Sequence, residues 1–504
     1  MASDIAYLEG KKLAPADLGD VLILGLGKSG KSALAYCAAL LGTRVRTLYV
    51  AAGADTPESR AFVETYEGEN VVVAFGDDAV QTLSAQASGP FDVCIASPGI
   101  PYWAPLYEQG AAASAELISE VEFAWRESAA ASTWIAITGT NGKTTVTSWL
   151  AYVLSHAGFA ANAVGNIGDV CLDAVAAGTT QVYVAEVSSY QLASTKNFAP
   201  NVAVQLNITP DHIHWHKTLE AYRDAKFKMF DNLSTVPGAV AVLDATCDVV
   251  RAKVRELKAL SAEERGFSYI PVGTRAGITG DMRAACGAQN AAFVDGEGRI
   301  VVALNGTEHV LCNTTDLLLK GEHNVSNAIA VASAAVAAGA EDAAIAAALA
   351  TFEPLEHRIE PCGVVRGIAC YNDSKATNVD ATCKALCAFP GKRLVVLLGG
   401  DDKDTDLSDL IALAHKTAQA VVCFGAAGDR FEAEFTAASD AAPANFAVLR
   451  ASHLEDALDT ALAAACDPEV VLLSPACASF DEFKSFEHRG RVFKDLVAAR
   501  AGVR

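Results

Sequence analysis

Two glycine-rich loops constrain the fold of this chain more than any other feature of its sequence. The first is "ILGLGKSGKS" at residues 23–32, and the second is "ITGTNGKTT" at residues 137–145. Each comes after a short apolar run and precedes a helix-type pattern. A strand that passes through a glycine turn into a helix is the opening unit of a parallel sheet. The two loops therefore predict α/β domains built on parallel sheets.

Apolar runs of strand length recur along the whole chain and fall into three blocks. The chain has 504 residues, which is more than one hydrophobic core usually supports. We expect an α/β protein with three domains, at residues 1–119, 120–354 and 355–504. The first and third are expected to be Rossmann-like, and the second to be a parallel sheet of the P-loop ATPase type. A helical pattern over residues 116–128 marks the first boundary, and "AAFVDGEGRIVVAL" at residues 291–304 predicts a hairpin.

The charge and the apolar runs of the chain bear on its partners and its compartment. The formal net charge is −21, so the surface repels nucleic acid and anionic membranes. The first residues lack the apolar core of a signal peptide, and the longest apolar runs are too short to span a bilayer. We expect a cytoplasmic monomer with reduced cysteines, and neither nucleic acid nor membrane as a partner.

The two glycine loops differ in the strands that come after them along the chain. The first loop fits GxxxxGKS fully, whereas the second has Ile137 in place of the first glycine. A P-loop holds phosphate on backbone N–H groups, and it needs an acidic Mg²⁺ ligand on a nearby strand tip. The strand "QVYVAEVSS" supplies Glu186 to the second loop, where Thr144 offers a hydroxyl. No strand tip after the first loop carries a carboxylate, so we expect ATP on the second loop and a pyrophosphate on the first.

The first loop also fits GxGxxG, the pattern of dinucleotide-binding proteins. An NAD site needs an acidic residue at the end of the second strand, and the nearest one, Asp55, lies several residues too late. An NAD-dependent oxidoreductase is therefore the weaker alternative. Two others stay open, a plain strand–helix turn at this loop and a nucleotide-binding module without catalysis.

Three histidines come after a strand of the second block at alternating positions, His212, His214 and His216. In an extended segment they would share one face and could bind zinc, but the Pro–Asp pair before them predicts a turn. One histidine that reaches Mg²⁺ or a phosphate is the preferred interpretation. Lys226, in "AYRDAKFKMF", has by itself the pattern of a solvated helix lysine.

Seven short motifs occur in a fixed order over nearly the whole chain. They are "TGTNGKTT", "GNIG", "EVSSYQL", "GEHNVSNA", "EHR", "NDSKATN" and "SPACASFDEFKSFEHRG". In this order the chain resembles the Mur ligase family, and "ASPGIP" fits the branch whose N-terminal domain holds a UDP group. The resemblance implies an ATP- and Mg²⁺-dependent ligase that adds D-glutamate to UDP-N-acetylmuramoyl-L-alanine through an acyl phosphate. The nearest alternative is a Mur ligase for another amino acid, or a folylpolyglutamate synthetase.

The resemblance also implies roles for individual residues. ATP would be held by Gly139, Thr140, Asn141, Gly142, Lys143, Thr144, Thr145, Asn324, Asn327, Arg358 and Asp373. Mg²⁺ would be held by Thr144, Glu186, His212 and a carbamylated Lys226, and catalysis would rest on Lys143, His212, Lys226 and Arg358. D-Glutamate would contact Lys375, Thr377, Lys403, Ser479, Phe480 and Phe486. The UDP-linked substrate is expected at Gly25, Gly27, Lys28, Ser29, Gly30, Ser97, Pro98, Gly99, Asn166 and Ser188.

Overall fold

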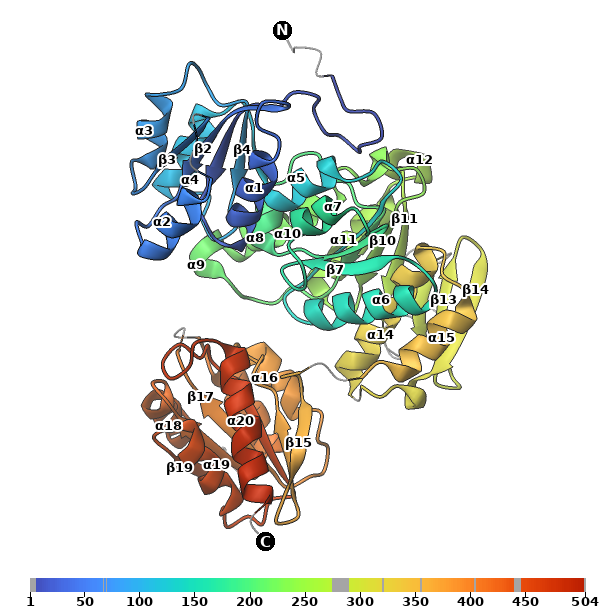
Figure 1. The fold of residues 1–504 in the computed structure, drawn as a ribbon. Coiled ribbons are helices and arrows are strands. Elements are labelled where there is room, and N and C mark those ends of the chain that lie inside the picture. Colours follow the sequence, from blue (N-terminus) through green and yellow to red (C-terminus); the bar gives the residue numbers. More distant parts are fainter. Residues whose placement is uncertain are drawn as a thin grey trace. The chain divides into compact units, whose positions relative to one another are not determined.

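Three β-sheets form the framework of the protein in its computed structural model (Figure 1). The structure describes residues 6–66, 68, 70–273, 290–319, 321–353, 356–402, 405–438 and 446–502. Met1–Leu317 with Ser326–Thr351 pack as one unit that holds two sheets, and Leu318–Val325 with Phe352–Arg504 pack as a second unit that holds one. The expected α/β class with mostly parallel sheets is confirmed. Among the described residues, no helix has the length and apolar character needed to cross a membrane.

The first sheet has the strand order β3-β2-β1-β4-β5, and all its neighbouring strands are parallel. Its strands are β1 (Gly19–Leu24), β2 (Val45–Ala51), β3 (Val71–Ala74), β4 (Val93–Ala96) and β5 (Leu117–Ser119). Its helices are α1 (Lys28–Ala38), α2 (Pro57–Glu64), α3 (Ala79–Ser84) and α4 (Pro105–Ala113). The strand order reverses between β1 and β4, and such a switch point is where α/β sheets bind ligands. The first glycine loop comes directly after β1, and the segment that begins at Ser97 comes directly after β4.

The helix expected over residues 116–128 begins later than its pattern indicates. Leu117–Ser119 form β5, which pairs with β4, and α5 spans Glu120–Glu127. Ser119 caps this helix because its side chain accepts a hydrogen bond from the Glu122 N–H. A strand of three residues has too few apolar positions to reveal its period, so the sequence pattern merges it with the helix.

The second sheet has the order β14-β13-β12-β11-β10-β9-β6-β8-β7, with parallel pairing from β7 to β12. Its strands are β6 (Thr133–Thr138), β7 (Ala161–Gly165), β8 (Val182–Glu186), β9 (Val202–Gln205), β10 (Val240–Asp244), β11 (Ser268–Val272), β12 (Ala291–Val294), β13 (Arg299–Leu304) and β14 (Thr307–Asn313). The helices of this part are α6 (Lys143–His156), α7 (Cys171–Ala177), α8 (Ser189–Ala193), α9 (Ile213–His216), α10 (Leu219–Phe227), α11 (Asp248–Ala259), α12 (Ala262–Arg265), α14 (Glu322–Ala337) and α15 (Asp342–Thr351). The expected hairpin is confirmed, since β12 and β13 pair antiparallel.

The third sheet lies in the second unit and has the order β15-β16-β20-β17-β18-β19. Its strands are β15 (Glu360–Val365), β16 (Ile368–Asn372), β17 (Leu394–Gly399), β18 (Ala420–Phe424), β19 (Ala447–Arg450) and β20 (Val470–Ala476). Its helices are α16 (Val379–Leu386), α17 (Ser408–Thr417), α18 (Gly428–Ala437), α19 (Leu454–Leu462) and α20 (Phe486–Ala501). Only the pairing of β15 with β16 is antiparallel, so the carboxyl ends of the other strands share one edge.

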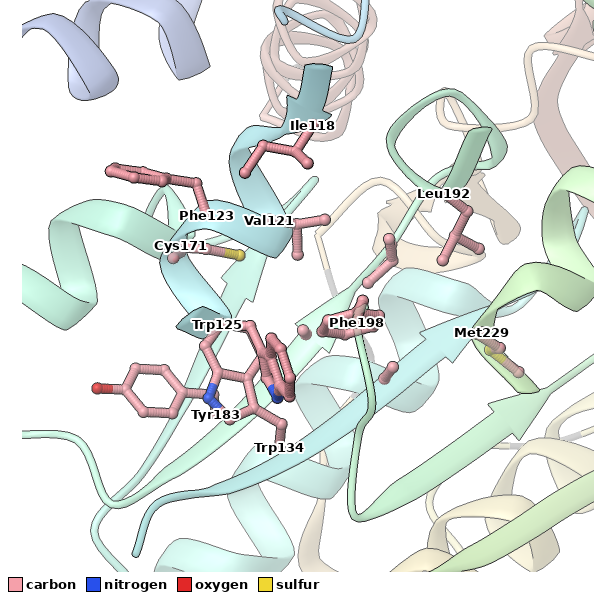
Figure 2. Close-up of a cluster of buried hydrophobic side chains, with 14 of the residues drawn as sticks. Ile118, Val121, Phe123, Trp125, Trp134, Cys171, Tyr183, Leu192, Phe198 and Met229 are labelled. Carbon is pink, nitrogen blue, oxygen red and sulfur yellow. The ribbon is translucent and has the colours of Figure 1, made fainter. Parts of the chain in front are cut away.

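A cluster of buried aromatic side chains joins α5 to the second sheet (Figure 2). The rings of Trp134 and Tyr183 stack with their centroids 4.6 Å apart. Phe198 packs edge-on against both Trp134 and Trp125, the latter from α5. Buried residues of β1 and β4 belong to the same cluster, so the first two sheets share one core. Because Trp134 lies in β6, this packing fixes the strand that leads into the second glycine loop.

Polar contacts reinforce this junction of the first two sheets. Ser32 in α1 donates a hydrogen bond from its hydroxyl to Asp173 in α7. Glu120 in α5 accepts a hydrogen bond from the Leu172 N–H at 2.8 Å, but its second carboxyl oxygen has no hydrogen-bond partner among the described residues. Burial, and to a smaller extent the charge of Asp173, raises the pKa of Glu120 to about 7.

The raised pKa of Glu120 makes stability depend on pH. Between its ordinary pKa and about 7, the folded protein retains a proton that the unfolded chain has released. The free energy of unfolding therefore falls by about 3 kcal/mol as the pH rises through this interval. Glu120→Gln should remove that loss, so the variant gains about 3 kcal/mol relative to the wild type between pH 5 and pH 8. Urea unfolding of the first unit at both pH values measures the difference, with the exposed Glu64→Gln as control. Parallel pH dependence of wild type and Glu120→Gln would contradict the assignment.

Candidate active site

The second glycine loop connects β6 to α6 in a conformation that suits an anion. α6 begins at Lys143, and its N-cap residue Gly142 has a left-handed backbone with φ +85°. A Cβ atom at Gly142 would lie 2.7 Å from the Asn327 side-chain oxygen, so a side chain does not fit there. The N–H groups of the first turn of α6 lack acceptors within the helix and are suited to bind a phosphate, whereas those of Thr140 and Asn141 donate to Asn207. Asn327, predicted for the nucleotide site, lies beside this loop.

Two lysines converge on the carbonyl groups of the same loop. Lys143 Nζ donates to the Gly139 oxygen at 2.7 Å and to the Thr140 oxygen at 2.8 Å. Lys226 Nζ, from α10, donates to the Gly139 oxygen at 2.8 Å and to Thr138 Oγ1 at 3.3 Å. Lys226 is buried, and its burial together with the charge of Lys143 holds its pKa well below the usual lysine value. It is therefore an uncharged amine over a wider pH range than an exposed lysine.

Glu186 supplies the carboxylate that a metal site at this loop requires. It ends β8 and pairs with Ile137 of β6, so it lies at the start of the loop. One carboxyl oxygen accepts a hydrogen bond from Asn166 Nδ2 at 2.7 Å, and the other is buried without a hydrogen-bond partner among the described residues. A buried carboxylate oxygen without a partner is costly unless a cation binds it. With the hydroxyl of Thr144 in the first turn of α6, these oxygen donors fit Mg²⁺.

The three histidines do not gather into a zinc site. His212 precedes α9 with φ +55°, and its Nδ1 lies 2.6 Å from the Tyr190 hydroxyl. His216 Nε2 lies 2.9 Å from Ser189 Oγ, and burial lowers the pKa of His216 to about 4. The ring centroids of His212 and His214 are 6.3 Å apart. His212 and His216 both lie beside Tyr222, whose hydroxyl group shares a hydrogen bond with Thr140 of the loop, so the preferred interpretation, that one histidine, His212, reaches Mg²⁺ or a phosphate, stays a prediction.

Three side chains of the second unit, Glu356, His357 and Glu360, form the one group of at least three His, Cys, Asp or Glu residues within the described ranges whose ligand atoms lie close enough together for a metal ion. Lys494 Nζ already lies 3.2 Å from Glu356 and 2.5 Å from Glu360. The lysine ammonium thus supplies the positive charge at this cluster, so these carboxylates do not require a metal.

The first glycine loop has the strand–turn–helix form predicted for an anion site, but the side chains of its GKS pattern are not placed as in an ATP site. A Cβ atom at Gly30 would lie 1.9 Å from the Gly25 oxygen, which explains the glycine there. Lys31 Nζ pairs with Glu58 at 2.8 Å, and Ser32 is bonded to Asp173. The lysine and serine that complete the GKS pattern therefore have partners away from the loop. Asp55, the candidate ribose ligand of an NAD site, is likewise paired with Arg60.

The segment after β4 meets the first loop at the switch point of the first sheet. Ser97 Oγ donates a hydrogen bond to the Gly25 oxygen at 3.1 Å. This contact brings together the two segments predicted to hold the UDP group.

The second unit assembles its own predicted residues around the ends of β16 and β20. Asp373 comes directly after β16 and is buried, and burial raises its pKa to about 7. Its carboxylate accepts hydrogen bonds from Ser474 Oγ at 2.7 Å and from the Ile359 N–H at 3.2 Å, next to Arg358. Lys375 Nζ lies 4.0 Å from the centre of the Phe486 ring.

Family models and curated relatives identify the chain. The Mur ligase middle domain matches residues 137–335, and the Mur ligase, glutamate ligase domain matches residues 357–477. The chain is 35% identical over 483 residues to UDP-N-acetylmuramoylalanine–D-glutamate ligase of Koribacter versatilis, covering 95% of this chain and 97% of the relative. The chain belongs to the Mur ligase family. The ligase of the same name from Acidobacterium capsulatum is 35% identical over 500 residues, covering 98% of each chain.

Solved structures of two other ligases share the fold. UDP-N-acetylmuramate-alanine ligase from Thermotoga maritima aligns with a TM-score of 0.52 at 17% identity, covering 95% of this chain and 99% of that one. A pseudomurein peptide ligase type C from Methanothermus fervidus aligns with a TM-score of 0.54 at 16% identity, with the same coverage. The resemblance stated from the motifs is thus confirmed, and as a Mur ligase the protein is an ATP-dependent ligase.

The predicted site residues of this Mur ligase fall into both units. The first unit holds Gly25, Gly27, Lys28, Ser29, Gly30, Ser97, Pro98, Gly99, Gly139, Thr140, Asn141, Gly142, Lys143, Thr144, Thr145, Asn166, Glu186, Ser188, His212, Lys226 and Asn327. The second holds Asn324, Arg358, Asp373, Lys375, Thr377, Ser479, Phe480 and Phe486, and Lys403 lies outside the described residues. Two of the residues predicted to bind the UDP-linked substrate also shape the second glycine-loop region through hydrogen bonds within the protein. Ser188 caps α8, and Asn166 holds the carboxylate of Glu186.

Arg489 is a residue of this Mur ligase that the sequence interpretation missed. It is fully buried at the start of α20 and donates hydrogen bonds to Ser374 Oγ at 2.9 Å and to the Ala478 oxygen at 2.8 Å. It thus joins the loops that carry Lys375 and Ser479. The motif "FEHRG" contains it, but a single arginine in a helical pattern is usually solvated, so only the burial reveals its role.

The sequence interpretation also missed two tyrosines near the second glycine loop. Tyr222 shares a hydrogen bond with Thr140 Oγ1 at 3.0 Å and is buried. Tyr190 contacts His212 through its hydroxyl group. Both positions lie in motifs quoted from the sequence, yet the pattern itself does not show which side of a helix faces the loop.

Proposed function

We propose that this Mur ligase joins D-glutamate to UDP-N-acetylmuramoyl-L-alanine and converts ATP to ADP and phosphate. The observation that carries the ATP-binding part is the convergence of Lys143, Lys226 and the unpartnered oxygen of Glu186 on one phosphate loop, within the described residues. The choice of acceptor and amino acid is supported by the names of relatives that align over nearly the full chain.

The reaction forms an amide bond in two steps. The carboxylate of the UDP-linked substrate attacks the γ-phosphorus of ATP, and ADP leaves. The amine of D-glutamate then attacks the acyl carbon, loses a proton, and phosphate leaves with the electrons of the C–O bond. The first step brings two anions together, so positive charge must offset their repulsion.

The residues of the second loop supply this charge and the positioning. The N–H groups of residues 142–145 would hold the phosphates, and Lys143 would turn from the loop carbonyls to the phosphate oxygens. Thr144, Glu186, His212 and Lys226 would hold Mg²⁺, which polarises phosphate oxygens and offsets their charge. The lowered pKa of Lys226 favours an uncharged amine, the form that reacts with CO₂ to give the carbamate ligand.

The remaining residues would bind the two other substrates. The pyrophosphate of the UDP group would lie on the N–H groups of the first turn of α1, at residues 28–30, beside Ser97 and the two residues after it. Lys375, Thr377, Ser479 and Phe486 would hold D-glutamate, and Arg358 and Asp373 would hold the nucleotide.

An ADP-release assay with defined acceptors and amino acids tests this function. Turnover should require both UDP-N-acetylmuramoyl-L-alanine and D-glutamate, and mass spectrometry should find the acceptor heavier by one glutamyl residue. L-Alanine with UDP-N-acetylmuramate is the matched alternative pair. Turnover with that pair, and none with D-glutamate, would overturn the proposal.

A further inference from the structure

An aromatic pair in the segment after β4 reaches from the first sheet to α9. Trp103 Nε1 donates a hydrogen bond to the Trp215 carbonyl oxygen at 2.8 Å, and the Tyr102 hydroxyl donates to the His216 carbonyl oxygen at 3.3 Å. The Tyr102 and Trp215 rings meet edge to face at 5.4 Å. Both members of the pair are 40% exposed, although each makes a specific contact.

These contacts satisfy the end of a helix that has little stability of its own. α9 has only the four residues Ile213–His216, and the last carbonyl groups of any helix lack partners within it. The two carbonyl groups that Tyr102 and Trp103 bind are among these. The residues on either side of α9, His212 and Lys217, have φ values of +55° and +70°, a conformation that is unfavourable for residues other than glycine.

A further contact holds the carboxyl end of α9. Lys217 Nζ lies 3.5 Å from the centre of the Trp103 ring, a cation–π geometry. The Trp103 indole ring thus contacts both Lys217, the strained residue after the helix, and the carbonyl group of Trp215. Part of the stabilisation of α9 therefore comes from the first sheet, in addition to the contacts that His212 and His216 make with α8 of the second.

We propose that Trp103 and Tyr102 are positioning residues that hold α9, and through it His212, in the geometry of the reaction. The segment that carries them begins with Ser97, Pro98 and Gly99, so the UDP-linked substrate would act on α9 through the same segment. Only this last link and the role of His212 rest on the proposed function. The cap on α9, that is, the hydrogen bonds that Tyr102 and Trp103 donate to its last carbonyl groups, does not depend on the proposed function.

Hydrogen exchange of the backbone amides of residues 213–217 tests the cap without any ligand. Trp103→Phe keeps an aromatic ring below Lys217 but removes the indole N–H, and Tyr102→Phe removes only the hydroxyl. In the double variant these amides should exchange about tenfold faster, the effect of losing helix-capping hydrogen bonds. Tyr107→Phe is the matched control, because its hydroxyl bonds to Ser194 Oγ at 2.8 Å across the same two sheets without touching α9. Unchanged exchange in the double variant would overturn the proposal.

The catalytic consequence is tested on the same variants. The double variant should lose about tenfold in kcat, while KM for the UDP-linked substrate stays within about twofold. Trp103→Phe alone should show a smaller decrease in kcat. UDP-linked substrate without ATP should slow exchange in residues 213–217 of the wild type and not of the double variant. Faster exchange in α9 with an unchanged kcat would overturn the positioning role. Absence of any turnover in the wild type would instead overturn the proposed function and leave the exchange result for the cap intact.

Discussion

Lys143→Ala should lower kcat for ADP release by about 10²- to 10³-fold, because loss of one preorganised donor to a transferring phosphate has an effect of this size. Lys143 Nζ lies at the loop that would hold the phosphates, bonded to the Gly139 and Thr140 carbonyl groups. Its charge offsets the repulsion between the attacking carboxylate and the γ-phosphate. Steady-state ADP release at saturating substrates measures the loss.

Lys31→Ala is the matched control for Lys143→Ala, since both lysines come directly after a glycine near the start of a helix. Lys31 is paired with the exposed Glu58, so its loss should change kcat and KM for ATP by less than about threefold. If Lys31→Ala abolished ATP binding and Lys143→Ala did not, the assignment of the two loops would be reversed.

Lys226→Ala should lower activity by about 10³-fold or more, and a short carboxylate such as formate should restore part of it. Burial and the nearby Lys143 lower the pKa of Lys226, which increases the share of uncharged amine that can react with CO₂. The carbamate would give Mg²⁺ an oxygen ligand that alanine lacks, and a small carboxylate can enter the space left by the side chain.

Lys228→Ala is the control for this variant. Lys228 lies two residues further, bonds to the Ala193 carbonyl at 2.8 Å, and has a pKa that burial also lowers. Its loss should leave activity within about threefold and show no response to formate. Full activity of Lys226→Ala without added carboxylate would contradict a metal-binding role for Lys226.

Local sequence patterns predicted most of the framework. The alternation of apolar runs and glycine turns located the strands β1, β6 and β8 and the helices that come after two of them. Because the carboxyl ends of parallel strands share one edge, the sequence also predicted that Glu186 lies beside the second loop, and the pairing of Ile137 with Glu186 agrees. The short strand Leu117–Ser119 was missed, since three residues do not define a period.

Side-chain partners across long sequence separations were beyond these patterns. Arg489 looks like a solvated helix residue, yet it is buried between two loops of the second unit. Trp103 looks like part of an irregular segment, yet it caps a helix more than a hundred residues away. A pattern of one segment carries no information on which distant group completes its hydrogen bonds.

The sequence by itself determined the order of strands, glycine loops and helices, and therefore the class of fold and the two loops proposed to bind phosphate. It did not determine whether Lys31 or Lys143 lies against its own glycine loop. The first loop fits the ATP pattern better, but Lys31 and Ser32 are held by Glu58 and Asp173. Only the tertiary structure decided this, as it decided the burial and lowered pKa of Lys226. Charge, burial and hydrogen bonding depend on groups that folding brings together from distant parts of the chain, whereas the period of a strand or helix is local.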